Sequence, residues 1–260
     1  MIVSDNNPKI QLVRSLINQS KERKHSSLFV VEGLRLVEEA VASEWKIQSI
    51  FYSSNLSGRG IVLIQQCKQK NIQVEEISLP LMEKLTETKT PQGIIGVVHL
   101  CEVKIPEILD FVLICDAIRD PGNLGTMIRT SAAAGVQAVL LAPGTTDAFS
   151  PKVIRSGMGA HFTIPILQMG WNEIVQICHN RTFPLKIFGT MADAEQNCWQ
   201  INLCQPSAII VGGEADGMSE NAIQITDKFV SIPMPGRSES LNAAIAASIL
   251  LFEAVRQRSK

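Results

Sequence analysis

The sequence predicts an α/β protein whose C-terminal part is a mostly parallel sheet with helices on both faces. From residue 8 onward, apolar strand-like segments alternate with helix-like segments, which is typical of parallel sheets connected by crossover helices. The chain has 260 residues, enough for one large domain or two small ones. Its 45% hydrophobic and 19% charged content is ordinary for a protein with a packed core.

The elements expected in residues 1–100 form a small α/β domain. Pro8 opens a helix whose Ile10, Val13 and Ile17 share one face, and the helical pattern ends in the polar stretch 20–27. Strands are then expected at 28–33, 47–53, 72–78 and 93–100, and helices at 34–45, 60–71 and 80–88. Residues 101–108 are polar, contain proline and lack a period, so they predict a linker.

The elements expected after the linker form a second domain, residues 109–260. Strands are expected at 111–118, 136–143, 162–167, 184–191, 207–214 and 228–234, and helices at 123–134, 151–160, 171–180 and 241–255. The last helix is apolar on all sides, and such an element must be buried on all sides. One side can cover its own sheet, while the alanine-rich side allows another helix to approach closely.

Composition excludes several classes of protein. The 24 basic and 25 acidic residues give no sign of a nucleic-acid partner, although the first 35 residues hold 6 basic against 3 acidic side chains, with Lys21, Arg23 and Lys24 close together. The six cysteines show no C-x-x-C pair, which indicates reduced thiols rather than zinc or disulfides. No secretory signal is expected in the polar N-terminus, and the longest apolar run is too short to span a membrane, so a cytoplasmic location is expected.

Three glycine-containing loops follow expected strands. Ligands of parallel α/β sheets bind at the carboxyl ends of the strands, where "DPGNLGTMIRT" (120–130), "VGGEADGMSE" (211–220) and "IPMPGRSESLNAA" (232–244) are expected. Taken singly, each loop is also compatible with an ordinary turn before a capped helix. Neither G-x-G-x-x-G nor a phosphate-binding loop occurs, which disfavours a nicotinamide dehydrogenase or a Rossmann-type methyltransferase.

Taken together and in this order, the loops resemble the three motifs of the SpoU, or TrmH-like, family of RNA 2′-O-ribose methyltransferases in the SPOUT superfamily. The first motif is matched by Asn123, Gly125, Arg129 and Thr130, the second by Gly212, Glu214 and Gly217, and the third by Ile232, Pro233, Met234, Gly236, Ser240, Leu241 and Asn242. Residues 150–166 resemble the family's segment between its first two motifs. Residues 1–100 resemble the RNA-binding domain, similar to a ribosomal-protein fold, that precedes many members.

The resemblance implies a deep trefoil knot formed by the C-terminal segment and a homodimer built through the last helix and the knot. It also implies that S-adenosylmethionine binds in the knot, without a metal ion. The cofactor-binding residues would be Thr190, Gly212, Gly213, Gly217, Ile232, Met234 and Leu241. The catalytic residues would be Arg129, Asn123, Glu214, Ser240 and Asn242.

The implied reaction is methyl transfer to a ribose 2′-hydroxyl, with structured RNA, and above all ribosomal RNA, as the expected partner. Transfer RNA is the alternative substrate, and a non-catalytic RNA-binding protein is the alternative class, which the intact set of motif residues disfavours. The family assigns proton removal to Arg129, but a guanidinium titrates far above neutrality. Arg129 could instead hold the substrate phosphate and align the hydroxyl. The target nucleotide, and which subunit supplies Arg129 to a given site, stay open.

Overall fold

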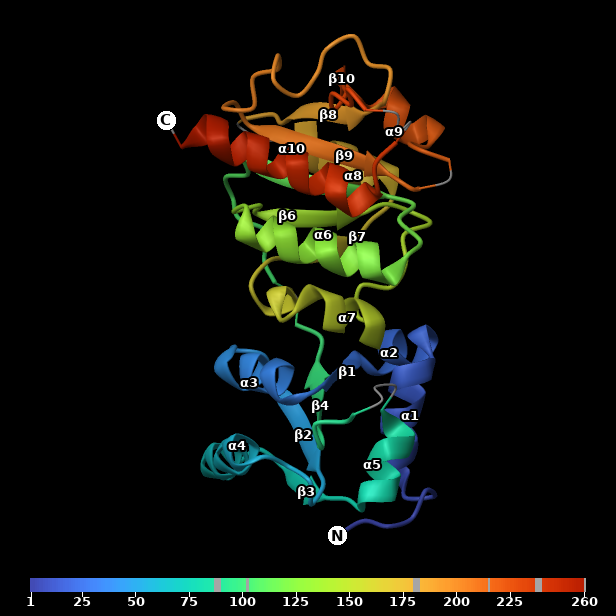
Figure 1. Cartoon of the computed structure of the whole chain (residues 1–260), viewed down its shortest axis with the longest axis vertical. Helices are drawn as coiled ribbons and strands as arrows, with labels where there is room; N and C mark the ends of the chain where they lie inside the picture. The colour runs from blue at the N-terminus through green and yellow to red at the C-terminus, as the bar shows by residue number, and fades with distance from the viewer. Residues whose placement is uncertain (87–89, 102, 180–182, 215, 237–239, 260) are drawn as a thin grey trace. The chain divides into compact units, whose positions relative to one another are not determined.

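The computed structural model describes residues 1–86, 90–101, 103–179, 183–214, 216–236 and 240–259, and its chain divides into two compact units (Figure 1). Unit 1 comprises Met1–Glu102 and Phe149–Phe162, and unit 2 comprises Val103–Ala148 and Thr163–Lys260. The expected linker lies where the first unit gives way to the second, whereas the segment 149–162 returns to the first unit. None of the helices in the described ranges combines the length and the apolar character needed to cross a bilayer.

Unit 1 is built on a four-stranded sheet of order β1-β4-β2-β3. Strand β4 runs antiparallel to β1 and β2, and β3 is parallel to β2. The strands are β1 (Leu28–Glu32), β2 (Ile47–Tyr52), β3 (Val74–Glu76) and β4 (Ile94–His99). The helices are α1 (Pro8–Asn18), α2 (Ser20–Ser26), α3 (Leu34–Ala42), α4 (Gly58–Gln69), α5 (Leu79–Leu85) and α7 (Pro151–Gly157), with the short 3-10 helix η1 (Ala160–Phe162). The strands and helices expected before residue 100 are present, with shifted ends.

Helix α2 occupies the polar stretch 20–27, where the helical pattern of the sequence was expected to end. Its Arg23 is only 5% exposed, and the guanidinium donates to the carbonyl oxygens of Leu16 and Ile17 at the end of α1. These carbonyls have no partner within their own helix, so Arg23 stabilises the corner between α1 and α2. Of the three basic residues that lie close together in the sequence, Lys21 and Lys24 are therefore exposed, whereas Arg23 is buried and stabilises the fold.

The segment 149–162 completes the core of unit 1. Phe149 and Phe162 pack with Phe29 of β1 and with Trp45, at ring-centroid distances between 5.2 and 6.3 Å. An ion pair of 3.3 Å joins α7 to the end of β1. Unit 1 therefore depends on residues that the chain supplies only after it has begun unit 2.

Unit 2 is built on a six-stranded sheet of order β10-β8-β9-β5-β6-β7, in which the described neighbouring pairs are parallel. The strands are β5 (Phe111–Asp116), β6 (Ala138–Leu141), β7 (Ile166–Gln168), β8 (Lys186–Thr190), β9 (Ser207–Gly212) and β10 (Lys228–Val230). The helices are α6 (Pro121–Ala133), α8 (Trp171–His179), α9 (Glu220–Gln224) and α10 (Ala243–Arg258). The predicted α/β class with a parallel sheet is confirmed.

Helices cover both faces of this sheet, because successive side chains of a strand point to opposite faces. Ile174 and Cys178 of α8 pack with Val112 and Ile114 of β5 in one cluster. On the other face α6 and α10 lie side by side, as Figure 1 shows. The strand expected at 162–167 is wrong in its first half, because Phe162 closes η1 in unit 1.

Candidate active site

The carboxyl ends of β8, β9 and β10 and the start of α10 enclose a pocket of about 200 Å³. It brings together all seven residues expected to bind the cofactor: Thr190, Gly212, Gly213, Gly217, Ile232, Met234 and Leu241. Glu214 and Ser240, from the expected catalytic set, line it as well. Segments that are far apart in the sequence meet here because the strands are parallel, so their carboxyl ends share one edge of the sheet.

Glycines shape one wall of this pocket because no side chain fits there. A Cβ on Gly212 would collide with the backbone of Gly217 and Met218, and one on Gly213 would lie 2.8 Å from the carbonyl oxygen of Ala117. Gly217 has a φ of 67°, a left-handed conformation that glycine adopts most readily. The second loop thus folds back on itself, and backbone forms the pocket wall.

The charge of the pocket discriminates between ligand classes. Glu214 is the one ionisable side chain among the described lining residues. The pyrophosphate of a dinucleotide needs cations or converging N–H donors, whereas this pocket offers a carboxylate together with apolar Met218, Met234 and Leu241. A cationic sulfonium compound suits this combination of one carboxylate and apolar side chains, and S-adenosylmethionine is such a compound.

A chain of hydrogen bonds joins the three motifs beside the pocket. Asn242 caps α10, its Oδ1 accepting from the backbone N–H groups of Ala244 at 3.0 Å and Ile245 at 3.3 Å. Its Nδ2 donates to Asn123 Oδ1 at 2.9 Å, and Asn123 Nδ2 donates to Glu214 Oε1. Backbone donors stand at one end of the chain and a carboxylate at the other, so both amides can take only one orientation.

The end of β5 contributes a carboxylate that the sequence analysis missed. Asp116 is 1% exposed; its Oδ2 accepts from the backbone N–H of Ser219 at 2.6 Å, and its Oδ1 has no partner among the described residues. An aspartate that closes an apolar strand directly before the first motif was the available signal. Burial, and to a lesser degree Asp116 itself, raises the pKa of the adjacent Cys115 thiol well above its usual range, so Cys115 is not a thiolate nucleophile.

Arg129 lies apart from the pocket of its own chain. It is exposed on α6, and no described residue forms a hydrogen bond or an ion pair with it. Six residues of α-helix place it about 9 Å along the axis from Asn123 and on a different side. The structure therefore brings together Asn123, Glu214 and Asn242, with Ser240 in the pocket, but not Arg129.

A second cavity, of about 380 Å³, adjoins the first pocket. The two share Gly213, Glu214 and Gly217, and Asn123 lines the second cavity. Its remaining polar lining includes Asp120 and the ion pair of Arg119 Nη2 with Asp216 Oδ2 at 3.4 Å. The Asn123–Glu214 bond thus borders both cavities. Within the described residues, no group of three or more His, Cys, Asp or Glu side chains could hold a metal ion.

A parallel sheet whose strand ends form a glycine-walled, cation-compatible pocket defines an α/β protein that binds a small ligand at the carboxyl edge of its sheet. The chain matches the profile of the SpoU rRNA Methylase family over residues 110–252, and that of the MRM3-like substrate binding domain over residues 7–96. It belongs to the SpoU rRNA methylase family, and the resemblance drawn from the three motifs is confirmed.

Several relatives and solved structures match nearly the whole chain. The 23S rRNA (guanosine(2553)-2′-O)-methyltransferase RlmP of Bacillus subtilis is 36% identical over 251 residues, which are 96% of this chain and 97% of that protein. The crystal structure of the SpoU methyltransferase AviRb from Streptomyces viridochromogenes in complex with AdoMet has a TM-score of 0.88 at 28% identity, covering 98% of this chain and 99% of that one. Human mitochondrial rRNA methyltransferase 3 is 28% identical in an alignment that covers 96% of this chain and 72% of that protein.

Proposed function

We propose that the protein transfers a methyl group from S-adenosylmethionine to a ribose 2′-hydroxyl of ribosomal RNA. The observation that carries the proposal is the hydrogen-bonded chain Asn242–Asn123–Glu214, which joins all three motifs at the border of two adjoining cavities. The names of the relatives support the substrate, because RlmP modifies a guanosine and the Streptomyces viridochromogenes relative a uridine of 23S rRNA. The base and position of the acceptor nucleotide are left open by this difference.

The seven pocket residues expected from the sequence would hold the cofactor, and AviRb supports this because its crystal structure contains AdoMet. When bound, S-adenosylmethionine supplies an electrophilic methyl group on its sulfonium. Glu214 would face this positive charge across the pocket. The apolar side chains of Met234 and Leu241 would exclude water from the site, and no metal ion is required.

The adjoining cavity would receive the acceptor nucleotide, since it lies across the Asn123–Glu214 bond from the cofactor pocket. Asn123 and Asn242, with Ser240, would orient the ribose so that its hydroxyl faces the methyl group. Arg129 would hold the neighbouring phosphate and align the hydroxyl, because its guanidinium forms bidentate bonds with phosphate and does not give up its proton near neutral pH.

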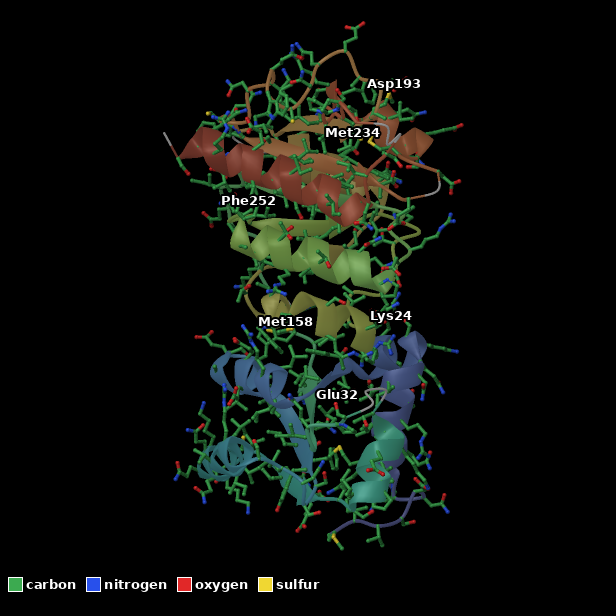
Figure 2. All side chains as sticks on the ribbon, in the orientation of Figure 1. Lys24, Glu32, Met158, Asp193, Met234 and Phe252 are labelled. Carbon is green, nitrogen blue, oxygen red and sulfur yellow. The ribbon has the colours of Figure 1, made fainter. Side chains whose placement is uncertain are left out.

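We also propose that two copies pair through α10. Four exposed large apolar side chains lie along one side of this helix and its approach: Leu241, Ile245, Ile249 and Phe252, the last of which is 49% exposed (Figure 2). A continuous apolar stripe on a soluble enzyme marks an interface. Because Arg129 is exposed and outside its own pocket, it would reach the site of the partner subunit. The trefoil knot stays part of this proposal, as does a cytoplasmic location.

Residues 1–100 would dock the RNA, residues 101–108 would link the domains and residues 109–260 would carry out the reaction. The match of residues 7–96 to a substrate binding domain supports this division. The exposed Lys21 and Lys24 are candidates for phosphate contacts. Transfer RNA remains the alternative substrate, whereas membership of the SpoU rRNA Methylase family sets aside the non-catalytic RNA-binding protein.

Two experiments test the proposal. Mapping 2′-O-methylated nucleotides in ribosomal and transfer RNA, with and without the gene, should reveal one ribosomal position that loses its methyl group. Isothermal titration in excess chelator should show S-adenosylmethionine binding. If no nucleotide loses a methyl group, the enzyme proposal fails, and if only a transfer RNA position does, the substrate is wrong. Binding that needs a divalent ion would refute the metal-free site.

A further inference from the structure

Asp116 is a buried carboxylate at the end of β5 to which the proposed reaction gives no role. The rest of the strand, residues 111–115, is apolar and at most 1% exposed, and Asp116 itself is 1% exposed. Its Oδ2 accepts one hydrogen bond, from the backbone N–H of Ser219, and its Oδ1 has no partner among the described residues. Burying a carboxylate on a single bond costs free energy, and an apolar residue would end this strand at a lower cost. The stability of the strand therefore does not explain Asp116.

The bond to Ser219 fixes the end of a loop that lines the cofactor pocket. We define the second-motif loop as the segment from Gly213 to Ser219. The distance from Ser219 N to Asp116 Oδ2 is 2.6 Å, and the Ser219 hydroxyl accepts from the backbone N–H of Ala222 at 3.3 Å, which caps α9. Asp116 thus holds the point at which the loop becomes a helix.

The start of the same loop lies against the residue that follows Asp116. Ala117 has a φ of 53°, a left-handed conformation that costs free energy in a residue with a Cβ. With this turn, the carbonyl oxygen of Ala117 lies so close to Gly213 that a Cβ there would be 2.8 Å from it. The N–H of Gly217 donates to the carbonyl oxygen of Gly213 at 3.0 Å. Both ends of the second-motif loop therefore rest on Asp116 and Ala117.

The loop carries Glu214 between these two ends. Glu214 Oε1 accepts from Asn123 Nδ2, the bond that joins the second motif to the first. The position of Asn123 is also set from β5, because Asp120 caps α6 and its Oδ1 accepts from the backbone N–H of Asn123 at 2.9 Å. Both partners of the Asn123–Glu214 bond are thus placed relative to the end of β5. A change at Asp116 would move one partner and not the other.

An exposed ion pair also joins the two loops, but it is a weak substitute for Asp116. Arg119 Nη2 lies 3.4 Å from Asp216 Oδ2, and the two side chains are 71% and 77% exposed. Exposed ion pairs contribute little because water and salt screen them. The bond from Ser219 to Asp116 is buried, where solvent does not weaken it.

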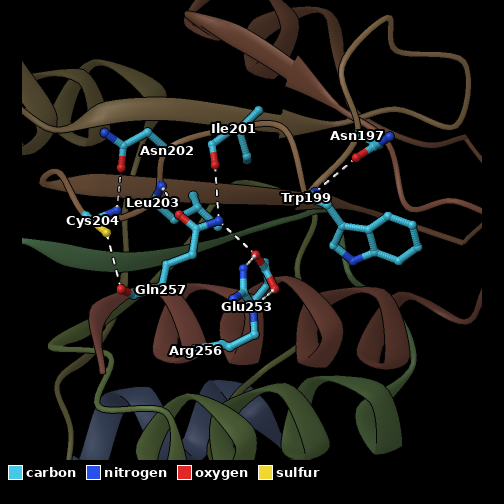
Figure 3. Close-up of polar contacts among 9 residues, drawn as sticks. All are labelled: Asn197, Trp199, Ile201, Asn202, Leu203, Cys204, Glu253, Arg256 and Gln257. Atoms are coloured by element: carbon cyan, nitrogen blue, oxygen red, sulfur yellow. Dashed lines mark hydrogen bonds and ion pairs between the residues drawn. The ribbon is translucent and has the colours of Figure 1, made fainter. Parts of the chain in front are cut away.

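Helix α10, on the opposite side of the cofactor pocket, is held by other contacts. Asn242 caps its first turn. Figure 3 shows Gln257 in its last turn, where Nε2 donates to the carbonyl oxygen of Ile201 at 3.1 Å and Oε1 accepts from the backbone N–H of Leu203 at 2.8 Å. The part of the pocket wall that depends on Asp116 is therefore the second-motif loop.

We propose that Asp116 is a positioning residue of the active site, which holds the second-motif loop on β5 and so sets Glu214 for its bond with Asn123. The proposal rests on the proposed function in taking this pocket as the site of methyl transfer. Without the bond to Ser219, the loop would sample positions in which Glu214 does not reach Asn123 and the glycine wall of the pocket is displaced. Small displacements of this kind lower the rate although the displaced anchor touches no substrate.

The test separates the hydrogen bond of Asp116 from its charge. Asp116→Asn keeps an oxygen acceptor for the N–H of Ser219 and removes the charge, whereas Asp116→Ala removes both. The matched control is Asp227→Ala. Asp227 Oδ2 also accepts from a backbone N–H, that of Ile187 at 2.8 Å, but at the opposite edge of the sheet, where β8 begins.

Four measurements are compared: single-turnover methylation, S-adenosylmethionine affinity, thermal unfolding, and hydrogen exchange of the Ser219 amide in the free protein. Asp116→Ala should lower the rate of methyl transfer about ten- to 100-fold, the effect of losing one hydrogen bond to a charged group. It should also weaken cofactor binding and expose the Ser219 amide to exchange. Asp116→Asn should stay within about threefold of the wild type in rate and affinity, with the amide protected. Asp227→Ala should change only the Tm.

A wild-type rate and cofactor affinity in Asp116→Ala, with only the Tm lowered as in the control, would overturn the proposal, because the bond would then serve stability alone. Equal defects in Asp116→Asn and Asp116→Ala would also overturn it, since the charge would then be required. Fast exchange of the Ser219 amide in the wild-type protein would do so even if Asp116→Ala does not fold. If the wild-type protein methylates no RNA, the proposed function fails, whereas a protected Ser219 amide and weaker cofactor binding confined to Asp116→Ala still support the positioning role.

Discussion

Replacing Asn242 by aspartate separates the two roles that the structure gives this side chain. Aspartate keeps the acceptor for the backbone N–H groups of Ala244 and Ile245, and it caps helices as well as asparagine does. Its charge is favourable at a helix N-terminus. The free energy of unfolding is therefore expected to change by less than about 0.5 kcal/mol.

The change does remove the donor to Asn123. The amide of Asn123 then faces a carboxylate on each side, Asp at 242 and Glu214, and can donate to only one of them. An unsatisfied contact of this kind costs about 1–3 kcal/mol, and each 1.4 kcal/mol of misalignment in the transition state is about tenfold in rate. The rate constant for methyl transfer should fall about ten- to 100-fold.

Asn242→Ala serves as the comparison, because it loses both the donor and the cap. It should lower stability by about 1 kcal/mol, a Tm shift of about 2–4 °C for a chain of this size. Single-turnover methylation of the mapped RNA and thermal unfolding measure the two effects. A wild-type rate in Asn242→Asp, or a loss of stability equal to that of Asn242→Ala, would refute the reasoning.

Three further changes test other parts of the molecule. Arg129→Lys keeps the charge but loses the planar fork, so methyl transfer should fall about 100-fold with unchanged cofactor affinity; a loss of less than about threefold would leave Arg129 without a catalytic role. Replacing Lys21 and Lys24 by alanine should weaken rRNA binding and lower the slope of its log affinity against log salt concentration by up to about two. Arg23→Ala should instead destabilise the protein by about 1–3 kcal/mol, which thermal unfolding would show. If the salt slope is the same with and without the two lysines, the RNA docks elsewhere. Phe252→Asp should yield a monomer by sedimentation, and an unchanged mass would exclude the proposed dimer face.

The fold class could be predicted because it depends on local patterns, whereas the pocket residues were expected from the resemblance of the three loops to the SpoU motifs. Apolar segments of strand length alternate with helical periods, and strand ends in a parallel sheet meet wherever the strands lie side by side. The hydrogen bonds from Asn242 to Asn123 and from Asn123 to Glu214 could not be predicted, because residues 91 or more positions apart interact only through the folded sheet. Asp116 was missed because an aspartate often follows an apolar strand at the start of an ordinary loop, so its type and position alone do not indicate a site.

Two features of unit 1 depend on contacts that no periodicity reveals. Helix α2 consists of seven residues, SKERKHS, without an apolar face, and it is held by the guanidinium of Arg23 on the end of α1. Phe149 and Phe162 flank the helix expected at 151–160, and Phe162 begins the strand expected at 162–167. The sequence pattern does not say which core these two side chains enter. Tertiary packing against Phe29 and Trp45 decides that.

The return of residues 149–162 to unit 1 has a consequence for how the protein is made and how it can evolve. During synthesis, Phe29 and Trp45 must wait for more than a hundred further residues before their aromatic partners leave the ribosome. The N-terminal unit therefore cannot complete its core until residues 103–148 of the other unit have been synthesised, although it starts first. For the same reason, an N-terminal module exchanged by recombination at residue 101 would arrive without part of its core. Such exchanges are viable only when residues 149–162 change together with the module they complete.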